Sequence, residues 1–357
     1  MAGTSQAATS NVIGASRVAG ITPLGWRWLA VAAALVATAA LPWLVSDYRV
    51  FQFTQAMIYA LALLGLNLLT GYNGQISLGH GAFFAIGGYT TAILMHRWGV
   101  PYYLTIAPAG ILSFAIGVSF GLPALRLENL YLALVTLSMA VATPQFLKYF
   151  DRWTGGSQGI VLDKPAAPAW IPIGTDRWLY HLSLAVLILV FWAARNLLTG
   201  RTGRALVAIR DRPISATAMG INTPLYKTLA FGVSALITGI AGSLGVLAAG
   251  FVAPDSFNVF LSISFIVGSV VGGIATIAGA VFGGLFIQFI PNLASGISDA
   301  APWAIYGLFL LAFMYVMPKG IAGSLAMLLG RIGAASQSAA EGQVQRAKGD
   351  PNKGGHR

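Results

Sequence analysis

Ten apolar stretches, separated by short polar connections, set the pattern of this chain. They run over residues 28–45, 53–70, 76–95, 102–121, 130–147, 179–198, 228–250, 258–273, 277–294 and 302–317. A helix that crosses the hydrocarbon core of a bilayer needs about 20 apolar residues, and shorter stretches imply tilt or partial insertion. The pattern predicts an all-α polytopic membrane protein with about ten membrane-crossing helical segments, some of them short or broken.

The stretch from residue 258 to residue 294 is too long for one span. As a single helix it would reach about 55 Å at 1.5 Å per residue, well beyond the thickness of a bilayer. A break near Gly272–Thr276 would divide it into two segments. We therefore expect two helices here, and one long tilted helix is the alternative.

The composition agrees with a membrane protein. Of the 357 residues 57% are hydrophobic and only 9% are charged, with a mean hydropathy of +0.75, whereas a soluble domain carries about 25% charged residues. There are 43 glycines and no cysteine, which excludes disulfides, thiolate zinc sites and iron–sulfur clusters. We expect no metal site and no catalytic residue in this chain.

The net charge of +11 comes from 21 Lys and Arg against 10 Asp and Glu. In a nucleic-acid binder the basic residues would gather with aromatic residues on one face. Here they lie between the apolar runs, where positive charge holds connections on the cytoplasmic side of a membrane. The charge therefore indicates a lipid bilayer as partner and no nucleic acid.

The distribution of basic residues also predicts the topology. Arg201, Arg204, Arg210 and Arg212 are opposed only by Asp211, so the 199–227 connection is expected in the cytoplasm. Six apolar stretches precede it, which places the N-terminus inside as well. The C-terminal end is basic and is also expected inside, through Lys319, Arg331, Arg346, Lys348, Lys353 and Arg357.

Three regions follow from this topology. Residues 1–26 are interpreted as a flexible cytoplasmic tail, 27–320 as the membrane domain and 321–357 as a basic cytoplasmic tail. The 148–178 connection falls outside. Its charges form three adjacent pairs of opposite sign, and its prolines favour an irregular connection over a long helix: Pro165, Pro168 and Pro172.

Small residues recur at helical spacing in two places, within Gly79–Thr91 and within Gly268–Gly284. Such stripes let neighbouring helix backbones approach closely. They are typical of tight packing in any membrane bundle, and they also occur where segments line a translocation path. Spacing alone leaves both interpretations open, with packing slightly favoured.

Few charged residues fall in the middle of the apolar stretches. A carrier driven by protons or sodium commonly holds ionisable groups at midspan, because they couple ion movement to transport. Their scarcity here indicates that energy arrives from another protein. A stand-alone secondary carrier is the alternative.

The 203–222 segment is predicted to form a helix–turn–helix. Ala205, Leu206, Ala208 and Ile209 repeat at helical spacing, with Arg204 and Arg210 exposed. Pro213 suits the first turn of a second short helix. Gly220 would end that helix as a C-cap, with Ile221 making the accompanying apolar contact. Such an element fits either a groove on a soluble partner or the membrane surface.

Ser77 and His80 raise an enzymatic reading, because an intramembrane serine protease also uses Ser and His. Their spacing supplies neither a converging geometry nor an oxyanion hole. Glycine packing explains the segment more simply, so we expect no proteolysis.

Four ordered segments resemble LivM-type permeases, the membrane subunits of branched-chain amino acid ABC importers. They are Gly65–Tyr89, Thr154–Gly159, the 203–221 loop and the glycine-rich 268–284 stretch. The resemblance covers about residues 50–320. Where many relatives have Gly-Gly-Leu-Gly-Thr, this chain has Gly273-Ile274-Ala275-Thr276, which replaces a glycine with alanine.

The resemblance implies a permease subunit of an ATP-driven importer in the bacterial inner membrane. Its partners would be a second, LivH-like permease, two cytoplasmic ATPases and a periplasmic binding protein, with 148–178 as a periplasmic loop. ATP and magnesium would bind to the ATPases, and this chain would bind no cofactor. It has no GxxxxGK[ST] motif, which agrees with ATP hydrolysis elsewhere.

The resemblance also assigns site residues. An ATPase-coupling loop would include Gly203, Arg204, Ala208, Arg210, Asp211, Ala216, Met219 and Gly220. Polar uncharged residues are candidates for the translocation path, or else satisfied packing groups: Asn67, Gln75, Ser77 and Thr136. The substrate is expected to be a branched-chain or related hydrophobic amino acid, and urea or a short amide is the alternative.

Overall fold

The computed structural model describes residues 23–124, 129–168, 173–297, 302–317, 320–325 and 327. The chain forms two compact units, residues 1–46 and 47–357. The described part of the first unit is the helix α1 (Pro23–Leu44) and the short turn after it. α1 begins inside the segment expected as a tail. The expected basic residues at the C-terminus, Lys319 to Arg357, and Pro172 lie outside the described residues.

The described part of the second unit is helical apart from one pair of short strands. Its elements are α2 (Asp47–Leu66), the π-helix η1 (Asn67–Tyr72), α3 (His80–Trp98), α4 (Tyr102–Ala124), α5 (Asn129–Tyr149), α6 (Asp151–Thr154), the 3-10 helix η2 (Gly156–Gln158), β1 (Ile160–Val161), α7 (Thr175–Thr199), α8 (Arg201–Asp211), α9 (Pro213–Ala218), α10 (Thr223–Ala249), β2 (Phe251–Val252), the 3-10 helix η3 (Pro254–Phe257), α11 (Val259–Gly272), α12 (Ile277–Ile297) and α13 (Pro302–Val316).

Each of the ten apolar stretches contains a helix, so the all-helical prediction is confirmed. Within the described ranges, six helical segments are long and apolar enough to cross a membrane. They are Asp47–Tyr72, Tyr102–Leu122, Thr175–Thr199, Thr223–Ala249, Pro254–Gly272 and Ile277–Ala294. The number of ten crossings stays a prediction.

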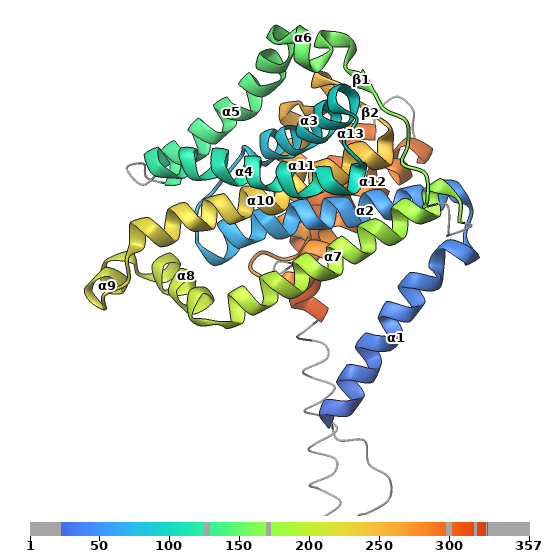
Figure 1. Cartoon of the computed structure of the whole chain (residues 1–357). Helices are drawn as coiled ribbons and strands as arrows, with labels where there is room; N and C mark the ends of the chain where they lie inside the picture. Colours follow the sequence, from blue (N-terminus) through green and yellow to red (C-terminus); the bar gives the residue numbers. More distant parts are fainter. Residues whose placement is uncertain are drawn as a thin grey trace, which may run out of the picture. The chain divides into compact units, whose positions relative to one another are not determined.

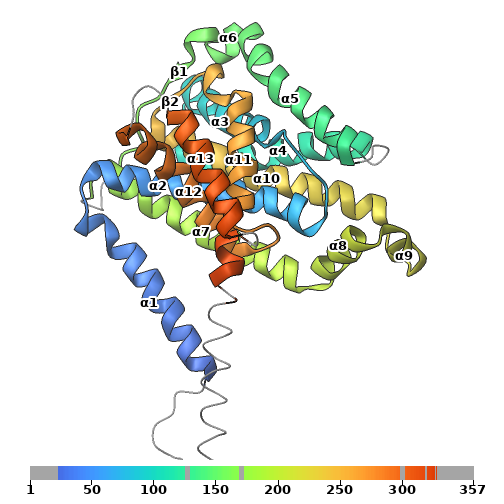
Figure 2. The same ribbon diagram turned by 180° about the vertical axis from the view of Figure 1, so that it is seen from behind.

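The predicted break in the 258–294 stretch is confirmed. α11 ends at Gly272 and α12 begins at Ile277, so one long helix is wrong. The two helices pack against each other, and α13 lies beside them on the side of the bundle seen in Figure 2. The connection is only four residues long, Gly273–Thr276, and we call it the 273–276 turn.

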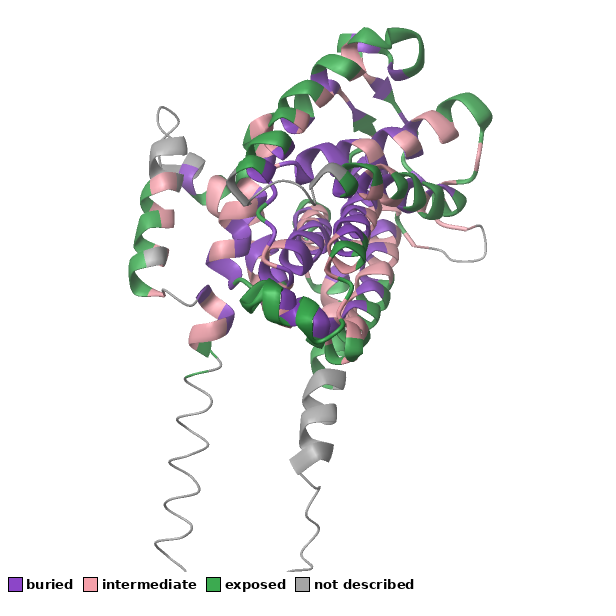
Figure 3. Ribbon diagram, turned by 90° about the vertical axis from the view of Figure 1, so that its left-hand side faces the viewer, coloured by how far each residue is buried: buried purple, intermediate pink, exposed green. Residues whose placement is uncertain are grey.

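The core of the second unit lies around α2 and α10. α2 contacts α7, α10 and α12, while α10 also contacts α3 and α4, and these helices run side by side in Figure 1. Every residue of α2 from Ala60 to Leu66 is buried, as expected of a helix that is apolar on all sides. Buried residues accordingly gather at the centre of the bundle (Figure 3).

Small residues make this close packing possible. A Cβ at Gly87 of α3 would overlap the carbonyl oxygen of Gly239 in α10, and one at Gly242 of α10 would overlap the backbone of Phe84. In the α11–α12 pair, a Cβ at Gly283 would overlap the carbonyl oxygen of Gly268. Both glycine stripes therefore serve helix packing within this chain.

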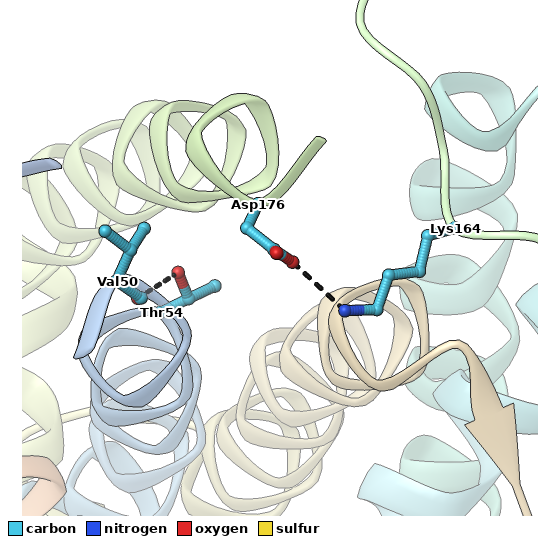
Figure 4. Close-up of polar contacts among 4 residues, drawn as sticks. All are labelled: Val50, Thr54, Lys164 and Asp176. Carbon is cyan, nitrogen blue, oxygen red and sulfur yellow. Dashed lines mark hydrogen bonds and ion pairs between the residues drawn. The ribbon is translucent and has the colours of Figure 1, made fainter. Parts of the chain in front are cut away.

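The connection between α5 and α7 is mostly irregular, as expected. It begins with α6 and η2, and β1 then pairs antiparallel with β2, with Ile160 opposite Val252. Lys164 forms a 3.0 Å ion pair with Asp176 in the first turn of α7, drawn in Figure 4 beside the 2.9 Å hydrogen bond from Thr54 to the carbonyl oxygen of Val50. The connection is thus fastened to the helical bundle at two places.

Candidate functional site

The 201–220 segment forms two helices at one end of the bundle, and we call it the elbow (Figure 1). α8 ends at Asp211, and Pro213 opens α9 at its first turn. Gly220 has φ +83°, and the amide of Ile221 reaches back to the carbonyl oxygen of Ala216 at 3.1 Å. The predicted helix–turn–helix with its glycine C-cap is therefore confirmed.

The elbow residues assigned from the sequence fall into two groups. Gly203 and Ala216 are buried, and a Cβ at Gly203 would overlap the backbone of Leu198. Ala208 is half-buried. The exposed members are Arg204, Arg210, Asp211, Met219 and Gly220.

Two exposed apolar side chains, Ile214 and Met219, mark the tip of the elbow. The sequence analysis assigned Met219 to the coupling loop but did not assign Ile214. Ile214 and Met219 are each 86% exposed, among the most exposed large apolar residues of the described chain. Exposed apolar groups next to arginines are typical of a protein interface, where apolar anchors and arginine carry much of the binding free energy. Ile214 was findable, because it follows the helix-opening Pro213 and lies on the face opposite the buried Ala216.

Arg210 is turned toward the bundle. Its Nη1 donates a 2.8 Å hydrogen bond to the carbonyl oxygen of Gly71 in η1, and its Nε lies 2.9 Å from Asp211 Oδ1. Its aliphatic stem covers Gly74, where a Cβ would lie 2.7 Å from Arg210 Cγ. The side chain is 34% exposed. Arg210 therefore joins the elbow to the π-helix.

The π-helix η1 holds the 273–276 turn. The Asn67 side chain is fully buried, and its amide donates to the carbonyl oxygens of Gly273 (3.4 Å) and Thr276 (3.2 Å). Its oxygen accepts a 2.7 Å bond from Ser269. π-turns within α-helices occur frequently at functional sites.

The 273–276 turn is strained at one position. Ala275 has φ +60°, the one non-glycine residue with positive φ among the described residues. For an L-residue with a Cβ this left-handed conformation costs roughly 1–2 kcal/mol. This is the position at which the sequence analysis found alanine replacing a glycine, so the turn keeps the glycine-type backbone without the glycine.

Gln75, Ser77 and Thr136 lie around the loop between η1 and α3. The Gln75 amide donates to the carbonyl oxygen of Lys227 at the start of α10 (3.3 Å). Thr136 of α5 accepts a 2.9 Å bond from the amide of Leu78, and Ser77 accepts one from Gly79. All three are buried. Asn67, Gln75 and Thr136 thus bind backbone groups of other segments, while Ser77 binds one of its own loop. The assignment of the four residues to a translocation path stays a prediction.

His80 completes a buried hydrogen-bonded chain. Its Nδ1 lies 3.1 Å from Ser77 Oγ, and its Nε2 lies 2.7 Å from Ser234 Oγ. Ser234 donates its own proton to the carbonyl oxygen of Gly65 (2.6 Å), so it must accept from His80. Nε2 therefore carries the proton and Nδ1 accepts from Ser77.

This chain of bonds does not make a protease. Ser77 and His80 are each 1% exposed, so no peptide bond can reach the hydroxyl. Neither residue lines a described cavity. The sequence analysis expected no converging geometry from the spacing of Ser77 and His80, yet the two side chains are in hydrogen-bond contact. The partner Ser234 comes from α10 and left no sequence signal.

The larger described cavities are apolar. One of about 450 Å³ lies between α3, α4 and α5, and one of about 380 Å³ lies between the elbow, α4, α7 and α10. Within the described ranges, no three His, Asp or Glu residues lie close enough together to hold a metal ion.

Comparisons with known proteins agree on one family. Residues 48–318 match the model described as "Branched-chain amino acid transport system / permease component". The chain is 31% identical to the high-affinity branched-chain amino acid transport system permease protein LivM of Salmonella typhimurium, over 81% of this chain and 73% of the relative. The LivM protein of Escherichia coli K12 is likewise 31% identical, over 82% of this chain and 74% of the relative.

A second type of permease is also similar. The LivH protein of Salmonella typhimurium is 27% identical over 76% of this chain and 92% of its own length. No solved structure matches.

Proposed function

Since the chain belongs to the permease components of branched-chain amino acid transport systems, we propose that it moves branched-chain or related hydrophobic amino acids inward as the LivM-like subunit of an ATP-driven importer. The match over residues 48–318 carries the proposal. The protein is a multi-pass membrane permease of a bacterial ABC transporter, a family whose members are not themselves enzymes.

The proposed complex contains three further subunits and a soluble partner. A LivH-like permease would complete the translocation path, two cytoplasmic ATPases would bind ATP and magnesium, and a periplasmic protein would deliver the substrate. Similarity to both LivM and LivH proteins supports a pair of related permeases. This chain would bind no cofactor itself.

We place ten crossings in the bacterial inner membrane, with both termini in the cytoplasm. Alternation of the helices then puts the start of α2, the end of α3, the start of α4 and the end of α5 on the outer side. Each of these ends carries an exposed aromatic residue with a polar atom, namely Tyr48, Trp98, Tyr103 and Tyr149. Such residues mark membrane–water interfaces, which supports the arrangement.

The elbow is the proposed contact with an ATPase. On the proposed topology it lies in the cytoplasm, where Ile214 and Met219 are free to enter an apolar groove of that partner. Closure of the ATPase pair on ATP would move the elbow, and the membrane helices would alternate between outward and inward access. Asn67, Gln75, Ser77 and Thr136 would reach the path only if their present hydrogen bonds rearrange.

Uptake by the reconstituted complex tests the proposal. The chain is placed in liposomes with its partner permease and ATPases, and the binding protein is supplied with radiolabelled leucine. ATP-dependent accumulation of leucine is expected. Uptake driven by an ion gradient in liposomes that hold this chain alone would identify a secondary carrier instead. Uptake of urea or a short amide but not of leucine would overturn the proposed substrate.

A further inference from the structure

The end of α8 is linked to the break between α11 and α12 by a continuous line of short contacts. Arg210 Nη1 donates to the carbonyl oxygen of Gly71 at 2.8 Å. The other side of Gly71 meets Ala275, because a Cβ on Gly71 would lie 2.5 Å from the Ala275 nitrogen. The elbow therefore reaches the 273–276 turn through a single residue of η1.

Gly71 and Ala275 are packed so closely that no side chain fits between them. Gly71 has only hydrogen where another residue would have a side chain, and the backbone of Ala275 fills that space. Packed protein interiors are dense and transmit displacement instead of absorbing it. A shift of Gly71 along this contact must therefore move the turn.

The turn itself is held on two further sides. Asn67, in the first position of η1, donates to the carbonyl oxygens of Gly273 and Thr276. Gly320 also lies against Gly273, since a Cβ on Gly320 would lie 2.5 Å from Gly273 Cα. The turn is thus in contact with both ends of η1, through Asn67 and Gly71, and with Gly320 after α13.

Both linked elements depart from regular geometry. η1 is a π-helix, a rare turn that is found within α-helices and frequently at functional sites. Ala275 has φ +60°. Backbone strain of this kind clusters at functional sites and in switch regions.

We infer that Arg210 is a positioning residue that carries movement of the elbow through η1 to the 273–276 turn, so that the nucleotide cycle acts on the helix break. This inference rests on the proposed function. It differs from a docking role, in which Arg210 would contact the ATPase and leave the turn unaffected. Nη1 of Arg210 already donates a hydrogen bond to Gly71, whereas the side chains of Ile214 and Met219 are exposed and can contact the partner.

The test uses the complete complex in liposomes with Arg210→Met, which keeps an unbranched stem over Gly74 and removes the guanidinium. Arg210→Lys keeps the charge and can still donate toward Gly71. Arg195→Met is the matched control, because Arg195 is an exposed arginine of α7 outside the elbow. Uptake, ATP hydrolysis and co-purification of the ATPases are measured for each variant.

A spin label reports on the turn directly. The chain has no cysteine, and Ile274 in the turn is 47% exposed, so Ile274→Cys accepts one label at a known position. The electron paramagnetic resonance line shape is recorded with and without a non-hydrolysable ATP analogue. A merely structural defect would alter the line shape in both states, whereas loss of coupling would abolish the difference between them.

We expect Arg210→Met to lower uptake about tenfold, the scale of a typical coupling free energy between sites, while the ATPases still co-purify and hydrolyse ATP. The nucleotide-dependent change in the line shape of the Ile274→Cys label should disappear, and Arg210→Lys should restore part of both signals. Arg195→Met should behave as the parent.

Normal uptake by Arg210→Met would overturn the inference. Loss of the ATPases from the purified Arg210→Met complex would also overturn it and make Arg210 a docking residue. A nucleotide-dependent line shape that survives in Arg210→Met would have the same effect. Failure of the proposed function is distinct from these results, since it would appear as absence of ATP-driven uptake in the unmodified complex.

Discussion

Asn67 donates its side-chain amide to the carbonyl oxygen of Thr276 across 3.2 Å, although the two residues lie 209 positions apart in the chain. The contact joins the π-turn at the end of α2 to the turn that separates α11 from α12. A turn between two helices leaves carbonyl oxygens without helical partners, and buried ones need partners elsewhere in the protein. The side-chain amide of Asn67 is that partner for two carbonyl oxygens of the 273–276 turn, those of Gly273 and Thr276.

Replacement of Asn67 by leucine should therefore destabilise the protein. The carbonyl oxygen of Thr276 and the hydroxyl of Ser269 would each lose a buried partner, at a cost of about 1–3 kcal/mol for an unsatisfied group. Denaturant unfolding in detergent micelles measures the loss. Gln145→Leu is the control, since Gln145 is exposed, and an equal loss in both variants would contradict the assignment.

Ala275→Gly should stabilise the fold. Glycine adopts φ +60° freely, so the substitution removes roughly 1 kcal/mol of backbone strain. The same substitution at Ala278, within the first turn of α12, should cost up to about 1 kcal/mol through lower helix propensity. Thermal unfolding should therefore show a higher midpoint temperature for Ala275→Gly and a lower one for Ala278→Gly. Destabilisation by Ala275→Gly would show that the Ala275 methyl contributes more by packing than it costs in strain.

The protonated nitrogen of His80 is open to direct measurement. Because Ser234 donates to Gly65, His80 should carry its proton on Nε2 and accept at Nδ1. Nitrogen-15 NMR of histidine-labelled protein distinguishes the two tautomers. The chain has four histidines, and His80→Gln identifies the signal by its disappearance. A proton on Nδ1 would mean that Ser234 does not donate to Gly65.

Met219→Asp should release the ATPase without unfolding the permease. Met219 is 86% exposed, so the folded chain loses little, whereas the proposed interface would have an apolar anchor replaced by a charge. If the proposed interface is right, we expect at least about a tenfold loss of affinity in a co-purification titration, equivalent to about 1.4 kcal/mol.

Val161→Asp is the control for that experiment, because Val161 is an exposed apolar residue of β1 at the opposite end of the bundle. Gly203→Glu is a poor substitute for Met219→Asp. A side chain at Gly203 would overlap the backbone of Leu198 and disturb the turn between α7 and α8. ATPase binding that persists in Met219→Asp would remove the tip of the elbow from the interface.

Local signals in the sequence predicted the elbow and the helix break. Pro213 and Gly220 act on their own backbone, so they place the start and the end of α9 without reference to the remaining chain. The break after Gly272 followed from length alone, because a bilayer limits how far one helix can run. The ten apolar stretches located the helices because a helix that crosses a bilayer needs a long run of apolar residues.

Contacts between distant segments escaped the sequence analysis. Nothing near Arg210 indicates that its guanidinium turns to Gly71, 139 positions away. The π-turn of η1 and the partner Ser234 of His80 likewise depend on how α2, α3 and α10 pack. The four polar residues proposed for the path were recognised as notable by their type, but their bonding partners are set by tertiary structure.

The pairing of β1 with β2 bears on how the bundle moves. β2 directly follows α10, whose 27 residues extend about 40 Å from the elbow end. The pairing fastens that remote end of α10 to the connection between α5 and α7. Any displacement of α10 must therefore carry the connection between α5 and α7 with it or break this strand pair.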